Sequence, residues 1–378
     1  MPRLRLDLLA LAFGLAFGLP IGEQARGADS VKTLKETVSG RIVAMSPLQI
    51  DVERSSDGKQ GGAEGAPAKA VEEIPVNQIV MVSFDNEPED LTAAKTQIAG
   101  NRFVEALATL ERITSDKDNA PRDEIKQDME FYKALCSARL AVAGMTPIAD
   151  AGRMMKAFID GNPKSFHCLE GAETLGNLLV AARQYPLAAE YFARLDKTPW
   201  PDYKMRAGIA NGRSLFAQDQ NDEAMKAFDV VLAIDAGGEL ADAKRELADA
   251  KRELVDAQRV WASLGRASVL AATQKSDEAI RIVEDIILKA NPEDEPLQAR
   301  AYNVLGTAYR QAGRAKEALL AFLHVDLLYP NVLDAHAEAL GNLVELWGQM
   351  HRAERAQRAK KTLEEQYKES PWAKKGGA

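Results

Sequence analysis

The sequence predicts a mainly α-helical protein in which a small β module precedes a solenoid of about seven helix pairs. Apolar residues alternate with polar ones before residue 87 and follow a helical spacing after it. Alternation is typical of half-buried strands, and a period of ~3.6 residues is typical of amphipathic helices. In the helical part, one arrangement of small and large apolar residues recurs about every 34 residues, as expected for stacked helix pairs.

Residues 1–28 have the features of an export signal. Arg3 and Arg5 precede an apolar run from Leu8 to Leu19, and small residues follow at Gly27 and Ala28. The run is shorter than the ~20 residues that cross a bilayer, so we expect a cleaved signal peptide and an exported protein, periplasmic or extracellular. The alternative is an uncleaved anchor that holds the chain outside the membrane. We expect no membrane span after signal removal, because no later apolar stretch has membrane length.

Residues 29–86 are predicted to form the small β module. Short β-branched or alternating segments indicate three to five strands, and residues 55–70, rich in Gly, Ala, Ser and Lys, are predicted to be a disordered loop. Their arrangement resembles small SH3-like or Sm-like barrels. Because four short strands are marginal alone, we expect the module to pack against the helices. The segments span residues 37–45, 48–53, 73–76 and 79–84.

The most complete repeat unit spans residues 299–332. Each of its two helices carries a small residue where the helices cross, so that the backbones approach, and large apolar residues surround the crossing. A proline ends the second helix because it lacks an N–H and crowds the preceding turn. The defining positions are Tyr302, Leu305, Gly306, Tyr309, Ala318, Phe322 and Pro330. This pattern resembles the tetratricopeptide repeat consensus.

The same frame recurs along the chain, and the resemblance covers residues 87–371. The unit at 169–202 carries Gly176, Ala188 and Phe192, and the unit at 205–238 carries Gly212, Ala224 and Phe228. Residues 372–378 are predicted to be a disordered tail. Further units are expected at residues 87–113, 132–165, 260–292 and from 337 onward.

Residues 239–259 interrupt the spacing with a heptad written three times, ELADAKR, ELADAKR and ELVDAQR. A narrow seam of Leu and Ala at seven-residue intervals is typical of one long helix. The seam predicts a lengthened first helix of the following repeat, and a short coiled-coil docking site is the alternative. The seam residues are Leu240, Leu247, Leu254, Ala243, Ala250 and Ala257.

The sequence contains no catalytic or metal-binding constellation. Its four histidines do not form a metal-ligand pattern, and the chain has no phosphate-binding loop and no nucleophile elbow. We therefore predict that the protein is not an enzyme and holds no cofactor or metal. The formal net charge of −8 disfavours binding to nucleic acid. Cys136 and Cys168, near the starts of neighbouring first helices in this frame, are expected to be buried thiols, with a disulfide as the alternative.

The tetratricopeptide resemblance implies a concave surface lined by the first helix of each pair, where such proteins bind peptides. Guanidinium groups there would suit carboxylates of a peptide ligand. The alternative is that these arginines pair with acidic residues of adjacent helices. The candidate groove residues are Arg206, Arg213, Phe216, Arg300, Asn303 and Arg310.

The function implied is a non-catalytic scaffold or adaptor of the cell envelope that binds peptides or partner proteins in the groove. Two alternatives stay open. In the first, the chain is an accessory subunit of an envelope enzyme. In the second, it binds the cell wall through the β module.

Overall fold

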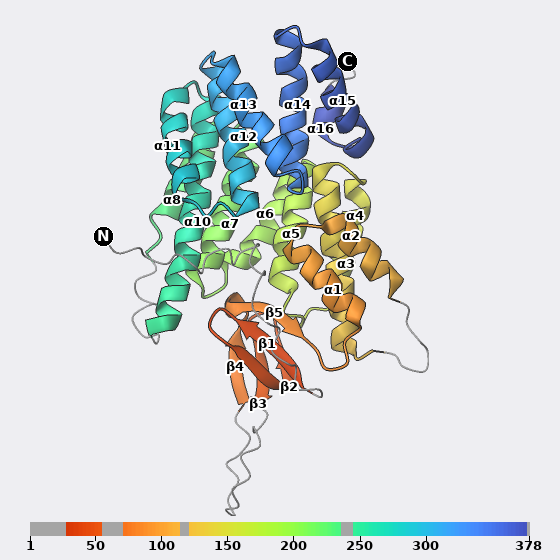
Figure 1. Cartoon of the computed structure of the whole chain (residues 1–378). Coiled ribbons are helices and arrows are strands. Elements are labelled where there is room, and N and C mark those ends of the chain that lie inside the picture. Colours follow the sequence, from red (N-terminus) through yellow and green to blue (C-terminus); the bar gives the residue numbers. More distant parts are fainter. Residues whose placement is uncertain (1–27, 55–70, 114–120, 236–244, 376–378) are drawn as a thin grey trace, which may run out of the picture.

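The β module lies at one end of a layered array of helix pairs (Figure 1). The computed structural model describes residues 28–54, 71–113, 121–235 and 245–375. The predicted signal segment, the loop at 55–70 and the start of the heptad segment lie outside the described residues, as do residues 376–378. Within the described ranges, no helix combines the length and apolar character that a membrane crossing requires.

The β module is one antiparallel sheet with the strand order β4-β3-β2-β1-β5. Alternation along β3 buries Ile50 and Val52 against the core, as the sequence pattern predicts. The sequence did not locate β1, whose five residues carry little pattern, although β1 pairs with both β2 and β5. The strands are β1 (Asp29–Thr33), β2 (Thr37–Met45), β3 (Gln49–Arg54), β4 (Val71–Pro75) and β5 (Ile79–Ser83).

The helices of the described residues form seven consecutive pairs, which confirms the predicted solenoid. The second pair begins at Asp123 rather than near residue 132, because polar residues in its first turns hide the helix in the sequence. The pairs are α1 (Glu89–Ala99) with α2 (Phe103–Arg112), α3 (Asp123–Ala143) with α4 (Ile148–Gly161), α5 (Cys168–Ala181) with α6 (Tyr185–Asp196), α7 (Pro201–Phe216) with α8 (Asn221–Leu232), α10 (Arg245–Ala272) with α11 (Ser276–Lys289), α12 (Glu295–Gln311) with α13 (Ala315–Leu328), and α14 (Leu333–Gln349) with α15 (Ala353–Gln366).

The helix crossings are built around the predicted small residues. A Cβ added at Gly306 would lie 2.7 Å from Cζ of Phe322, and one added at Gly176 would lie 2.3 Å from Cε1 of Phe192. Such distances leave no room for a methyl group, so glycine allows the second helix of each pair to press an aromatic ring onto the first. Gly212 meets the ring of Phe228 in the same way.

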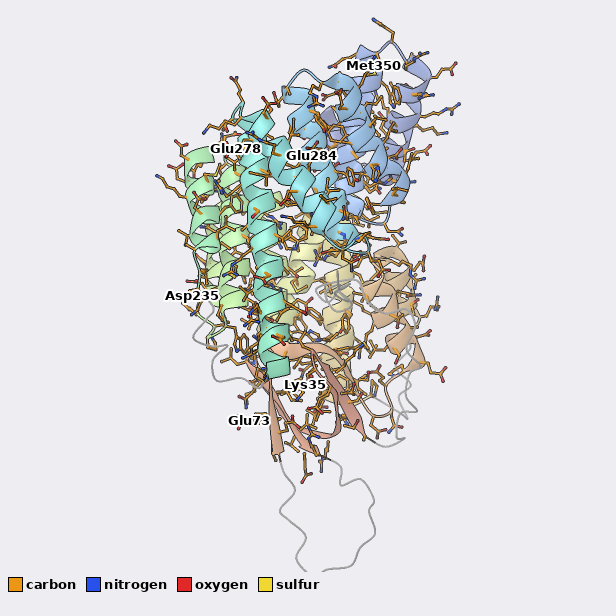
Figure 2. All side chains as sticks on the ribbon, turned by 60° about the vertical axis from the view of Figure 1, so that its left-hand side comes forward. Lys35, Glu73, Asp235, Glu278, Glu284 and Met350 are labelled. Atoms are coloured by element: carbon orange, nitrogen blue, oxygen red, sulfur yellow. The ribbon has the colours of Figure 1, made fainter. Side chains whose placement is uncertain are left out.

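Helix α10 contains the described part of the heptad segment and shows which of its residues are buried. In its heptad part the buried residues are Ala248 and Val255, and Ala262 continues this line, while Leu247 and Leu254 are only partly buried. The buried line is therefore displaced by one residue from the predicted Leu/Ala seam, because α10 packs on α7, α8, α11 and α12 rather than on a single partner helix. In two views the N-terminal end of α10 reaches the level of the β module (Figures 1 and 2).

The β module and the first repeats share one hydrophobic core, in which Val82 and Phe84 join Leu91, Ile125 and Tyr203. The module also contacts a later repeat, because Asn77 Nδ2 donates to Asp202 Oδ1 at the start of α7, at 3.2 Å. The sheet is thus anchored to helices of several repeats and not to the first repeat alone.

A buried network of charged side chains lies in this core. Lys95 Nζ lies 2.8 Å from Glu87 and 2.6 Å from Asp128, and it donates to the carbonyl oxygen of Val82. Asp128 also contacts His167 Nε2 at 2.7 Å. Burial alone would raise the pKa of Asp128, but Lys95 and His167 outweigh it and hold this pKa below its ordinary value.

The last helix pair returns to the second pair, so the array closes on itself. Helix α14 packs against α3, and the Glu369 N–H donates to the carbonyl oxygen of Gly144 at 2.8 Å. Gly144 has a φ of 84°, and a Cβ there would lie 2.3 Å from the backbone nitrogen of Ser370. The segment that follows α15 therefore meets the end of α3 backbone to backbone.

The predicted disordered tail is wrong for residues 372–375. These residues belong to a short helix, α16 (Pro371–Lys375), which packs on α14 and α15. The ring of Trp372 covers Gly341, where a Cβ would lie 2.7 Å from Cε3 of the indole. Trp372 is therefore one of the contacts that hold this segment on the array, together with the hydrogen bond from the Ala373 N–H to Ser370 Oγ.

Candidate binding groove

The first helices of four consecutive pairs, α7, α10, α12 and α14, line a half-open cavity of about 260 Å³. This arrangement places the cavity on the concave side of the array, where the resemblance to tetratricopeptide repeats puts ligands. Four predicted groove residues, Arg213, Phe216, Arg300 and Asn303, line this one cavity. Arg206 and Arg310 do not line it.

Three of the predicted arginines are paired with acidic residues of the neighbouring first helix. Arg206 pairs with Glu173, Arg300 with Asp334 at 2.6 Å, and Arg310 with Glu345 at 2.9 Å. The partners are 33, 34 and 35 residues apart, which is one repeat length. For these three positions the alternative holds, namely that the arginines pair with acidic residues of adjacent helices, because the repeat spacing brings a carboxylate to each guanidinium.

Arg213 differs from the other three. Within the described ranges it has no ion pair with a carboxylate, and its guanidinium instead lies 5.1 Å from the ring centroid of Trp261. Arg213 lines the cavity and its side chain is exposed to solvent. The protein atoms around its guanidinium and the nearby charge of Arg300 lower the pKa of Arg213 to about 10, so it stays cationic at neutral pH.

Trp261 joins the two cavity arginines. The guanidinium of Arg300 lies 5.7 Å from the same indole centroid, so both cations lie near one aromatic ring. Cation–π contacts of this kind hold a guanidinium without neutralising it. Trp261 follows Leu254 by seven residues and so continues the heptad spacing, and nothing in that spacing indicates a place in the groove.

The α14 side of the cavity is acidic. Burial and the neighbouring charge of Asp334 raise the pKa of Glu338 to about 7, although Arg300 and Asn303 act in the opposite direction. Asn303 is 1% exposed, and its Nδ2 donates to the carbonyl oxygen of Ala335 at 2.9 Å. In the part of the chain that the structure describes, Asn303 Oδ1 has no hydrogen-bond donor. Neither Asp334 nor Glu338 was predicted as a groove residue.

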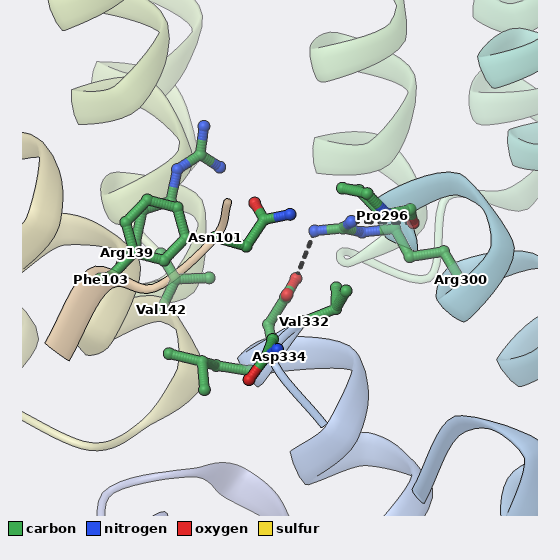
Figure 3. A pocket seen from close by; sticks show the side chains of 10 residues that line it. Asn101, Phe103, Arg139, Val142, Pro296, Arg300, Val332 and Asp334 are labelled. Carbon is green, nitrogen blue, oxygen red and sulfur yellow. Dashed lines mark hydrogen bonds and ion pairs between the residues drawn. The ribbon is translucent and has the colours of Figure 1, made fainter. Parts of the chain in front are cut away.

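A second, smaller hollow of about 80 Å³ lies where the array closes (Figure 3). Asn101, Phe103 and Arg139 approach it from the early repeats, while Arg300 and Asp334 approach it from the late ones. Burial would raise the pKa of Asp334, but Arg300 and Arg139 outweigh it and hold this pKa low. Asp334 therefore belongs both to the closure and to the wall of the groove.

The remaining titratable side chains have structural surroundings. In the described ranges no group of three or more His, Cys, Asp or Glu residues could hold a metal ion. His336 contacts Tyr367 and Asp326, and His324 stacks on Tyr302 with ring centroids 4.0 Å apart, so these two histidines do not form a pair with each other.

Both cysteines are free thiols. Cys136 lies in the middle of α3 rather than near the start of a helix, and burial raises its pKa to about 12. Cys168 Sγ donates to the carbonyl oxygen of Asn162 at 3.1 Å. The alternative of a disulfide is therefore not realised. Cys136 is a buried thiol, as predicted, whereas Cys168 is only partly buried.

No family model matches the chain, and no curated protein matches it either. Solved structures do match. A tetratricopeptide repeat protein from Parabacteroides merdae ATCC 43184 is 15% identical, with a TM-score of 0.41 over 74% of this chain and 92% of that chain. A Rap protein complexed with Competence and Sporulation Factor is 15% identical, with a TM-score of 0.46 over 75% of this chain and 76% of that chain. The chain is a helical-repeat protein.

A third match is the Cut9–Hcn1 hetero-tetramer of APC/C, which is 14% identical, with a TM-score of 0.31 over 76% of this chain and 54% of that chain. At these identities the likeness concerns the fold alone. The groove of this helical-repeat protein therefore has to be interpreted from its own residues.

Proposed function

We propose that this helical-repeat protein is a non-catalytic scaffold of the cell envelope that binds peptides or partner proteins in its concave groove. One observation carries the proposal. Arg213 is a cation held in the groove wall without a carboxylate partner in the described residues. A ligand carboxylate at this position would gain a charge-assisted hydrogen bond that the protein itself leaves unmade.

The apolar part of the cavity supports the same proposal. Phe216, Leu264 and Val304 line it beside the arginines, so a bound segment would remove apolar surface from water at the same time. Binding sites of this mixed character use apolar contact for affinity and a few polar groups for orientation. The placement in the envelope rests on the signal pattern of residues 1–28, and N-terminal sequencing of the protein from the envelope fraction tests it, with residue 28 or 29 expected first.

The groove is tested by charge reversal. We expect Arg213→Glu to weaken the binding of carboxylate-bearing peptides by at least ~10-fold, because removal of a charged hydrogen bond costs about 1.5–3 kcal/mol. Fluorescence anisotropy with a library of labelled acidic peptides measures this. The matched control is Arg281→Glu, an exposed arginine on the outer helix α11. Equal affinities for the two variants would rule out the groove as the binding surface.

A further inference from the structure

The two ends of the groove cavity carry opposite charge. The lining helices follow one another in the order α7, α10, α12 and α14, so Arg213 on α7 and Glu338 on α14 lie at opposite ends of the row. Arg300 on α12 lies between these two ends, and Asp334 lies on α14 beside Glu338. Arg300 and Asp334 neutralise each other through their 2.6 Å ion pair. What remains for a ligand is one cation at the first end and one acid at the other.

The cationic end is prepared for a single carboxylate. The Arg213 guanidinium lies against Trp261, and Glu173 and Asp334 act on it only from beyond ion-pair distance. The Arg213 side chain is exposed and forms no ion pair among the described residues, so a carboxylate there would not have to replace an existing partner.

The acidic end is prepared for a cationic donor. Asn303 Oδ1 is a buried acceptor with no donor among the described residues, and its orientation is set because Nδ2 is committed to Ala335. Glu338 faces Asp334 from its own helix and Arg300, Asn303 and Arg310 from α12, and among the described residues it forms no ion pair with a cation. An ammonium group supplies N–H donors for both oxygens together with the missing positive charge.

The size of the cavity limits the ligand. A volume of about 260 Å³ lies below the usual range of ~300–1,000 Å³ for pockets that take drug-sized ligands. A ligand of this volume has space for two charged ends and one aliphatic side chain. The apolar lining from Phe216, Leu264 and Val304 suits that side chain.

We propose that the groove cavity binds a small zwitterion, either an amino acid or a dipeptide, with its carboxylate at Arg213 and its ammonium group at Glu338 and Asn303. This inference rests on the proposed function, because it assumes that the groove is a binding surface. It goes further by requiring both a free amino end and a free carboxyl end on the same ligand.

The experiment is isothermal titration calorimetry on the full chain with L-leucine, L-alanyl-L-leucine, the N-acetylated dipeptide and the dipeptide amide. L-leucine and the free dipeptide separate the two sources of the zwitterion. We expect at least one of them to bind, and each blocked derivative to bind at least ~10-fold more weakly, because each loses one charged contact. These arms use the unmodified protein and do not depend on any variant being folded.

Two neutral variants assign the ends. Glu338→Gln should weaken the free dipeptide and leave the N-acetylated form unchanged, whereas Arg213→Gln should weaken the free dipeptide and leave the amide unchanged. Glu278→Gln, on the exposed start of α11, is the control.

Equal binding of the free and N-acetylated dipeptides would overturn the zwitterion proposal, and so would the absence of binding by both free ligands. If acidic peptides still bound through Arg213 in either case, the proposed scaffold function would stand alone. If acidic peptides also failed to distinguish Arg213→Glu from its control, both proposals would fall.

Discussion

At the scale of single residues, the fold depends on the positions of glycines, which have no side chain. Gly306 and Gly176 allow Phe322 and Phe192 to lie directly on the backbone of the partner helix. Protein interiors are packed as densely as organic crystals, so an added methyl group has nowhere to go. The effect is local, because the same residue type elsewhere in the array has empty space around it, as at Gly152.

These two environments predict opposite effects of the same substitution. Gly306→Ala should lower the free energy of unfolding by about 1–3 kcal/mol, since overpacking outweighs the gain in helix propensity. Gly152→Ala, inside α4 with nothing within 4 Å of the added Cβ, should raise it by about 0.5–1 kcal/mol. Denaturant unfolding followed by circular dichroism measures both. A stabilised Gly306→Ala variant would contradict the packing at the crossing.

At the scale of elements, the β module is joined to the repeats by apolar packing and by the buried network around Lys95. This side chain lies between Glu87, which follows the sheet, and Asp128 of α3, and it also binds the β5 carbonyl of Val82. Removing one member of a buried pair is costly because it leaves the partner charges uncompensated. The network is therefore positioned to make the sheet and the first helices unfold together.

Lys95→Met tests this coupling. It keeps the length of the side chain but leaves Glu87 and Asp128 without their cation, so we expect a loss of about 3–5 kcal/mol of stability. Hydrogen exchange should show faster exchange in β5 and α3 together. Lys126→Met removes an exposed lysine from α3, the helix of Asp128, and is expected to leave the thermal midpoint nearly unchanged, because exposed ion pairs contribute little. Loss of protection confined to α1 would argue against coupling between the two elements.

At the scale of the whole molecule, the decisive feature is the closure between the second and the last helix pairs. It holds α14 against α3, and α14 supplies Asp334 and Glu338 to the groove. The shape of the cavity therefore depends on a contact between parts of the chain that lie more than 200 residues apart, at Gly144 and Ser370.

Gly144→Ala is expected to open this closure. Any residue with a Cβ in the left-handed region costs about 1–2 kcal/mol, and at Gly144 the Cβ would also collide with the backbone of Ser370. Gly313→Ala incurs the same backbone cost at a φ of 75° with nothing within 4 Å, and it is the matched control. Small-angle X-ray scattering should show a larger radius of gyration for Gly144→Ala alone. Identical scattering of the two variants would show that closure tolerates the clash.

The sequence by itself determined the class of fold. The change of period near residue 87 predicts the β module and the helices, and the recurring glycine and aromatic positions predict the helix pairs. These features are local, because a crossing needs only residues within one unit of about 34 residues. The same frame also placed Arg213, Phe216, Arg300 and Asn303 on one concave surface.

Only the tertiary structure decided which of these residues are free to bind. Pairing of Arg206, Arg300 and Arg310 depends on which carboxylate an adjacent repeat presents, whereas Arg213 meets Trp261 from a lengthened helix. The acidic end of the cavity, the Lys95 network and the closure at Gly144 all join distant segments. Their positions follow from the curvature of the whole array, and that curvature is a sum over all repeats that no single stretch of sequence carries.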